Sequence, residues 1–167
     1  MSDESSGILA GEEGGVILVQ VNGRGTHENS HLLKQYLIQC LGEKRRAFQV
    51  NLSRCAYMDS TFLGMLAGFG SRARERSLPT MRLVNASERI RGMLESLGIE
   101  SLFEFVTQQT AAASLHELRG PAVSKEEKSR EMLEAHEKLV EISPSNAARF
   151  RDVIALLREK AGKTGPP

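Results

Sequence analysis

Three consecutive polar residues, Asp59, Ser60 and Thr61, form the part of the sequence that is best suited to chemistry. Each can accept a hydrogen bond from the unpaired amides of a first helical turn, and apolar residues at helical spacing follow them. A hydroxyl at such a helix start lies at the positive end of the helix dipole and can carry a phosphate there. The pattern therefore predicts a helix that begins at this triplet and presents a hydroxyl suited to act as a switch.

A catalytic role for Ser60 is the main chemical alternative. A nucleophilic serine needs a base aimed at its hydroxyl, most often His, and no His lies near Ser60 in the sequence. The chain also lacks a Gly-x-Ser-x-Gly elbow, a phosphate-binding loop with its Lys, and a carboxylate cluster for a metal. The sequence therefore predicts a protein that is not an enzyme and that uses no cofactor and no metal. A purely structural role for Asp59 and Ser60, as helix caps, stays open.

Composition argues against several further classes of function. The 167 residues carry 22 basic and 21 acidic side chains, a formal net charge of +1, so the overall charge does not favour nucleic acid. No apolar run approaches the length of a membrane span, and the polar N-terminus is not a signal peptide. Cys40 and Cys55 are too few for a disulfide framework, so we expect free thiols in a cytoplasmic protein. His27 and His31 share a helical face but lack a third ligand, so we expect surface residues rather than a metal site.

Apolar periodicity predicts an α/β domain in residues 1–110. Strands are expected at 8–10, 16–21, 47–52, 81–84 and 102–106, with helices after Thr26 or Asn29, after residue 59 and after a capping box that begins at Asn85. Helices that alternate with strands require crossover connections and a layered structure. Gly64 and Gly68 lie one turn apart and lower the helix propensity of the central helix, and close approach to a sheet is the simplest gain that offsets this cost.

The last third of the chain has a different composition. Residues 111–123 read as a linker, and Ser124 to Glu127 has the spacing of a capping box. Two apolar stripes separated by Ser143-Pro144 predict a helical hairpin over residues 124–162. The hairpin is too small to fold alone, so we expect it to pack on its own domain or to form a homodimer, with capture of a partner protein as the alternative.

The central motif resembles the signature of a known family. Anti-sigma factor antagonists carry Asp-Ser-Ser/Thr-Gly-Leu-Gly, and this chain is similar in Tyr57-Met58-Asp59-Ser60-Thr61 followed by Leu63 and Gly64. These proteins belong to the STAS family (sulfate transporter and anti-sigma factor antagonist domains), in which the Ser after the Asp is phosphorylated. The resemblance spans roughly the first two-thirds of the chain. It implies an α/β fold with a small mixed β-sheet and helices mainly on one face, here extended by the C-terminal α-helical hairpin.

The resemblance also implies a function and a site. An unphosphorylated antagonist binds an anti-sigma factor that is also a Ser/Thr kinase, phosphorylation ends this binding, and a protein phosphatase restores it. By position, the phosphorylated residue is Ser60, with Thr61 as the alternative. The partner-binding residues are Arg24, Thr26, Asp59, Ser60, Thr61 and Phe62. The alternative function is a non-switching STAS scaffold or accessory subunit of a signalling or lipid-transport complex.

The chain departs from the family pattern on its implied partner face. Phe62 replaces a Gly of the signature, and Arg24 and Thr26 stand where an apolar residue and an Asp are usual. Asn51 replaces a common Asp. We therefore expect a partner that differs from a typical anti-sigma kinase, and we expect Arg24 to stabilise a phosphate on Ser60 if the two loops adjoin.

Overall fold

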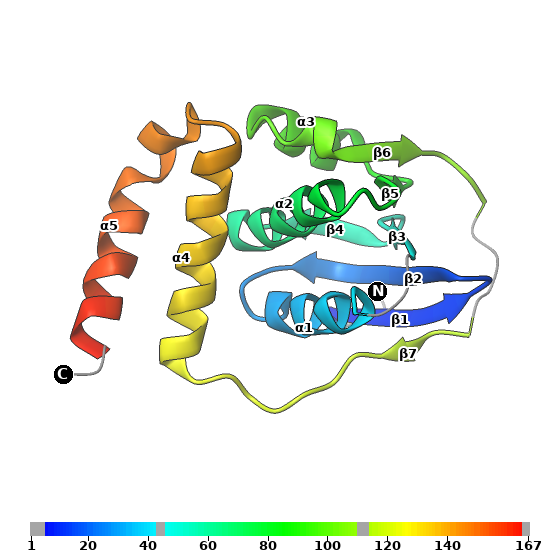
Figure 1. Cartoon of the computed structure of the whole chain (residues 1–167), viewed down its shortest axis with the longest axis horizontal. Helices are drawn as coiled ribbons and strands as arrows, with labels where there is room; N and C mark the ends of the chain where they lie inside the picture. Colours follow the sequence, from blue (N-terminus) through cyan, green and yellow to red (C-terminus); the bar gives the residue numbers. More distant parts are fainter. Residues whose placement is uncertain (1–5, 43–45, 110–113, 165–167) are drawn as a thin grey trace.

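The computed structural model describes residues 6–42, 46–109 and 114–164, and its centre is a mixed β-sheet (Figure 1). The sheet order is β6-β5-β3-β2-β1-β7. In that order the strands are Phe103–Val106, Met81–Val84, Ala47–Asn51, Val16–Gly25, Gly7–Glu13 and His116–Glu117. Strands β2, β3, β5 and β6 are parallel, and β1 is antiparallel to both β2 and β7. The mixed α/β sheet expected from the sequence is confirmed.

A short strand that the sequence did not predict, β4 (Cys55–Met58), pairs in parallel with the end of β2. The register shifts between Gly23 and Arg24, and the Gly23 amide donates to the carbonyl of Arg54 at 2.9 Å. This pairing places the loop that follows β2 directly beside the residues that begin the central helix.

Helices α1 (Ser30–Cys40) and α2 (Ser60–Glu75) lie over one face of the sheet (Figure 1). Burial alternates along β2: Ile17, Val19 and Val21 are buried, and the residues between them are half-buried. The apolar side chains therefore share one face of the sheet, which helices cover. Helix α3 (Glu88–Ser96) and the short turn η1 (Glu100–Leu102) connect β5 to β6. Among the described residues, no helix is both long and apolar enough to cross a bilayer.

The C-terminal residues form a hairpin of α4 (Lys125–Ile142) and α5 (Asn146–Thr164). Ser124 caps α4 by accepting the Glu127 amide, as the capping box predicts. Helix α4 packs on α2, and α5 lies on the outer side of α4 (Figure 1). The hairpin therefore docks on the domain of its own chain, one of the two expected arrangements, and a homodimer stays a prediction.

The segment that the sequence assigned to a linker contains strand β7. Its residues His116 and Glu117 pair with Ala10 and Leu9 of β1, and the Leu118 amide donates to the carbonyl of Ile8 at 2.8 Å. A composition argument cannot detect a two-residue strand whose only signal is its pairing partner. As a result, the chain is attached to the edge of the sheet before it enters α4.

Candidate functional site at the start of helix α2

Asp59 ties the start of α2 to the loop after β2. Its Oδ1 accepts the amide of Phe62 at 2.9 Å, which is the expected N-cap bond. Its Oδ2 accepts the amide of His27 at 2.9 Å and lies 3.3 Å from Nδ1 of the same residue. The Asp59 amide donates to the carbonyl of Gly25 at 2.9 Å. One carboxylate therefore holds two loops in register at the beginning of the helix.

His27 and His31 do not share a helical face, contrary to the expectation. His27 lies in the turn before α1, whereas His31 is on α1 with its side chain buried rather than at the surface. Within residues 6–42, 46–109 and 114–164, no group of three His, Cys, Asp or Glu side chains is arranged to hold a metal ion.

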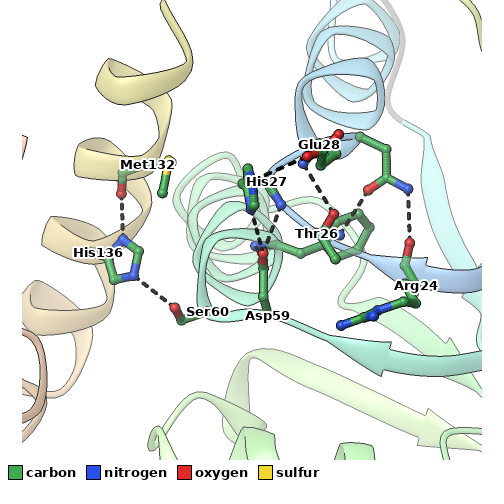
Figure 2. Close-up of polar contacts among 10 residues, drawn as sticks. Arg24, Thr26, His27, Glu28, Asp59, Ser60, Met132 and His136 are labelled. Atoms are coloured by element: carbon green, nitrogen blue, oxygen red, sulfur yellow. Dashed lines mark hydrogen bonds and ion pairs between the residues drawn. The ribbon is translucent and has the colours of Figure 1, made fainter. Parts of the chain in front are cut away.

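Ser60 is half-buried, and its hydroxyl is hydrogen-bonded to His136 of α4 (Figure 2). The distance from Oγ to Nε2 is 2.8 Å, and Nδ1 of the ring lies 2.6 Å from the carbonyl oxygen of Met132. A carbonyl can only accept, so the Nδ1 atom of His136 carries a proton. In the neutral ring, Nε2 is then the acceptor, and Ser60 donates its hydroxyl proton to it.

Sequence reasoning missed His136 as a neighbour of Ser60 because the two residues are 76 positions apart. In this pair the serine hydroxyl donates its proton to an imidazole nitrogen, as a nucleophilic serine does to its general base. However, His136 is only 3% exposed, and its ring packs against Phe150 with centroids 4.9 Å apart. The groove beside α2 is lined by Thr61 and Gly64 and not by Ser60. In this arrangement the pair joins two helices, and a substrate would have to displace α4 to reach the hydroxyl.

Gly64 and Gly68 face α4 rather than the sheet, which corrects the expectation from the sequence. A Cβ on Gly64 would lie 2.4 Å from the carbonyl oxygen of Ala135, and one on Gly68 would lie 3.5 Å from Cγ of Lys138. Low helix propensity indicated that something approaches α2 closely, but only the tertiary structure identifies the C-terminal hairpin as the neighbour.

Two of the expected partner-binding residues point into the protein. Phe62 is fully buried, and its ring fills the space beside Gly25, where a Cβ would come within 2.9 Å of ring carbons. Thr61, the alternative phosphorylation site, is 3% exposed. In this structure Phe62 is therefore not exposed to a partner, which corrects the expected exposure, and of the two adjacent residues Ser60 is half-buried while Thr61 is buried.

Arg24 and Thr26 adjoin the site from the end of β2 and the turn after it (Figure 2). The guanidinium of Arg24 lies 5.0 Å from the ring centroid of Tyr57, and that of Arg89 lies 5.7 Å from the same centroid. Both arginines are exposed, so two cations stack on one aromatic ring close to Asp59. Thr26 donates its amide to the side chain of Asn29 at 2.9 Å and so shapes the turn before α1.

Burial changes the acidity of several groups. Desolvation raises the pKa of Glu131, which lines the groove between α2 and α4, although Lys34 acts in the opposite direction. Desolvation also raises the pKa of Tyr36 on α1 to about 12. It raises the pKa of the thiols of Cys40 and Cys55 as well, and both cysteines are free, as expected.

Fold and site together define a class of protein: an α/β domain organised around a capped helix with a hydroxyl at its first residue, extended by a docked helical hairpin. A family model described as "Mlab, STAS domain" matches residues 8–107, which is more than half of the chain. The chain therefore belongs to the STAS domain family, and the resemblance seen in the motif is confirmed. The match ends before β7, so the hairpin lies outside the matched residues.

Solved structures with the same fold include two proteins described as anti-sigma factor antagonists. A candidate antagonist from Thermotoga maritima has a TM-score of 0.53 and 17% identity, over 59% of this chain and 85% of that one. An antagonist from Mycobacterium paratuberculosis has a TM-score of 0.50 and 19% identity, over 63% of this chain and 88% of that one. At such identities the similarity shows the fold alone. None of the curated proteins matches the chain.

Proposed function

We propose that the chain is a non-catalytic, protein-binding regulator of the anti-sigma factor antagonist type that acts in the cytoplasm. Unphosphorylated, it binds an anti-sigma factor that is also a Ser/Thr kinase; phosphorylation of Ser60 ends the binding, and a protein phosphatase restores it. One observation carries this proposal: Ser60, a half-buried residue, is the first residue of α2 and directly follows the capping carboxylate of Asp59. Membership of the STAS family supports it.

A phosphate on Ser60 would alter the charge of the site strongly. It adds about −1.5 to −2 charges, which the N-terminus of a helix tolerates. The neighbouring Asp59 carries the same sign of charge, and both of its oxygens already accept backbone amides. Inside an interface, the phosphate would add like-charge repulsion and a desolvation cost, so the partner would be released.

The accessible part of the proposed partner face is basic and aromatic. Among the described residues, neither Arg24 nor Arg89 takes part in a salt bridge. Arg89 lies in the first turn of α3, where the helix dipole disfavours a cation. Stacking on Tyr57 holds both guanidinium groups in place. An acidic partner surface gives a physical reason for this placement, and its binding would weaken as salt rises.

A second function, a non-switching scaffold, is favoured by the contact between Ser60 and His136. With α4 in place, the hydroxyl is engaged and not open to a kinase. An accessory subunit of a signalling or lipid-transport complex would associate stably and would be indifferent to substitution of Ser60.

Substitutions of Ser60 separate the two functions. With ATP and a kinase encoded near the gene, we expect one phosphate per chain, mapped to Ser60 by mass spectrometry and absent in Ser60→Ala. Ser60→Asp should lose kinase binding while Ser60→Ala retains it. If Ser60→Asp binds as well as the wild type, the switch is excluded and the scaffold stands. Arg24→Glu should weaken binding, whereas Arg151→Glu, at an exposed position on α5, should not.

A further inference from the structure

Helix α4 is buried along a narrow strip that contains one small, one polar and one apolar residue. Of the residues of α4, only Ala135, His136 and Leu139 are buried, and the backbone of Ala135 rests directly on Gly64. An ion pair between Lys34 and Glu134, with 2.9 Å between Nζ and Oε2, lies at the rim. A groove of about 180 Å³ runs beside the strip between α1, α2 and α4. Close backbone contact at Gly64, a few polar bonds and the buried side chain of Leu139, which belongs to the hydrophobic core, therefore seat α4 on α2.

Helix α5 is connected to the STAS domain mainly through α4. Its Phe150 packs against His136, and two hydrogen bonds join the hairpin turn to the domain. There, the buried side chain of Asn146 donates to the carbonyl of Leu97 at 2.9 Å, and Arg149 donates to the hydroxyl of Ser96 at 2.9 Å. Because these bonds hold the turn of the hairpin to the domain, α4 and α5 can move together about that turn when α4 leaves the start of α2.

A phosphate on Ser60 would break the present hydrogen bond to His136. Oγ and Nε2 are 2.8 Å apart, and Nδ1 already donates to Met132, so the neutral ring offers Ser60 only a lone pair. Phosphorylated Ser60 has no hydroxyl proton and carries acceptor oxygens and negative charge instead. Two acceptors would then face each other where α4 now lies.

From this geometry we propose that the α4–α5 hairpin covers the start of α2, including Ser60, within the same chain. Docking of the hairpin and phosphorylation of Ser60 then exclude each other. This inference rests on the proposed phosphorylation of Ser60 and adds the element that responds to it. The step forms an Oγ–P ester, breaks the terminal phosphoanhydride bond of ATP to release ADP, and passes the hydroxyl proton to the kinase and then to solvent. By linkage, docking hinders phosphorylation at equilibrium by the same factor by which phosphate weakens docking.

Release of the hairpin would expose the face of α2 that carries Gly64 and Gly68. Since α4 fits there with the main chain of Ala135 against Gly64, a partner that takes its place needs an equally small residue at that point. The hairpin thus competes with the partner for one surface, and the phosphate acts on both.

The test uses the full chain with phosphoserine installed at position 60 by codon reassignment. Hydrogen exchange read by mass spectrometry should show amides of α4 exchanging about tenfold faster or more, within the 5–150-fold range of typical coupling. Amides of β2 and β3 should be unchanged. Phosphoserine at position 87 is the control, because Ser87 is the N-cap of α3 and so also lies at a helix start, but it is exposed.

Unchanged exchange in α4 overturns the inference, including the case in which His136 gains a proton and pairs with the phosphate. Simultaneous loss of protection in β2 and β3 also overturns it, because the hairpin would then be an inseparable part of the core. A second experiment tests whether weaker docking of the hairpin favours phosphorylation. Gly64→Ala should speed phosphorylation of Ser60, whereas the control Gly92→Ala should be phosphorylated at the wild-type rate. Equal rates in both variants would again refute the inference. Binding of Ser60→Ala and Ser60→Asp to the kinase is measured separately, so the proposed function can fail or stand independently.

Discussion

Replacing Gly64 with alanine tests how closely α4 is seated on α2. The new Cβ would lie 2.4 Å from the carbonyl oxygen of Ala135 and 2.8 Å from its carbonyl carbon, whereas ordinary contact begins at 3.4 Å. Both are main-chain atoms that cannot rotate away, so α4 has to retreat by roughly 1 Å (3.4 − 2.4) to restore contact distance. Overpacking of this kind costs about 1–3 kcal/mol.

Alanine also has a better helix propensity than glycine, by roughly 0.5–1 kcal/mol. This gain is present whether or not α4 is docked, so it cancels in the free energy of opening α4. We therefore expect the full steric cost in that opening, which corresponds to about 5- to 150-fold faster exchange of α4 amides.

Native-state hydrogen exchange of the α4 amides measures this opening directly. Gly92→Ala on α3 is the matched control, because a Cβ there meets nothing within 4 Å. The control should stabilise the domain by up to about 1 kcal/mol and leave α4 exchange unchanged. If α4 exchanges equally fast in Gly64→Ala and in the wild type, α4 is not seated on Gly64, and the account of this interface is wrong.

Three further predictions concern single side chains. Asp59→Ala should lower the free energy of unfolding in urea by about 1–2 kcal/mol, because it removes a helix cap, and Asp59→Asn, which keeps an acceptor oxygen, should lose less. Burial raises the pKa of Glu131, so docking of α4 favours the protonated form and weakens as pH rises through that pKa. Glu131→Gln should therefore protect α4 amides better than the wild type at neutral pH and equally well in acid, and equal protection at neutral pH would contradict this. Tyr36 should ionise near its pKa of about 12 in the folded protein, so its contribution to stability is complete below about pH 10 and is lost through pH 12. The difference in ultraviolet absorbance between the wild type and Tyr36→Phe, measured against pH, checks this. An ionisation step near pH 10 in the folded protein would refute it.

Features that depend on neighbours along the chain were predictable from the sequence. The N-cap at Asp59 and the cap of α4 at Ser124 each need only residues within one helical turn, and both are present. The strands at β2, β3, β5 and β6 follow from short apolar, β-branched runs that a layered fold must bury. The two short strands escaped prediction because β4 and β7 are defined by their pairing with β2 and β1 rather than by their own composition.

The residues around Ser60 show where prediction from sequence stops. Arg24 was expected near the site and stacks on Tyr57 beside it, because β2 and β4 pair there. Phe62 was expected at the surface, yet it is buried, since a helix start specifies which backbone groups need caps but not which way each side chain turns.

Local chemistry determined that a hydroxyl stands at the start of a helix, that Asp59 caps this helix, and that glycines leave one of its faces bare. Only the packing of the whole chain decided what covers that face, because the contact between Ser60 and His136 joins residues 76 positions apart. Contacts across such separations depend on how complete elements dock, and no local pattern of residues encodes that docking.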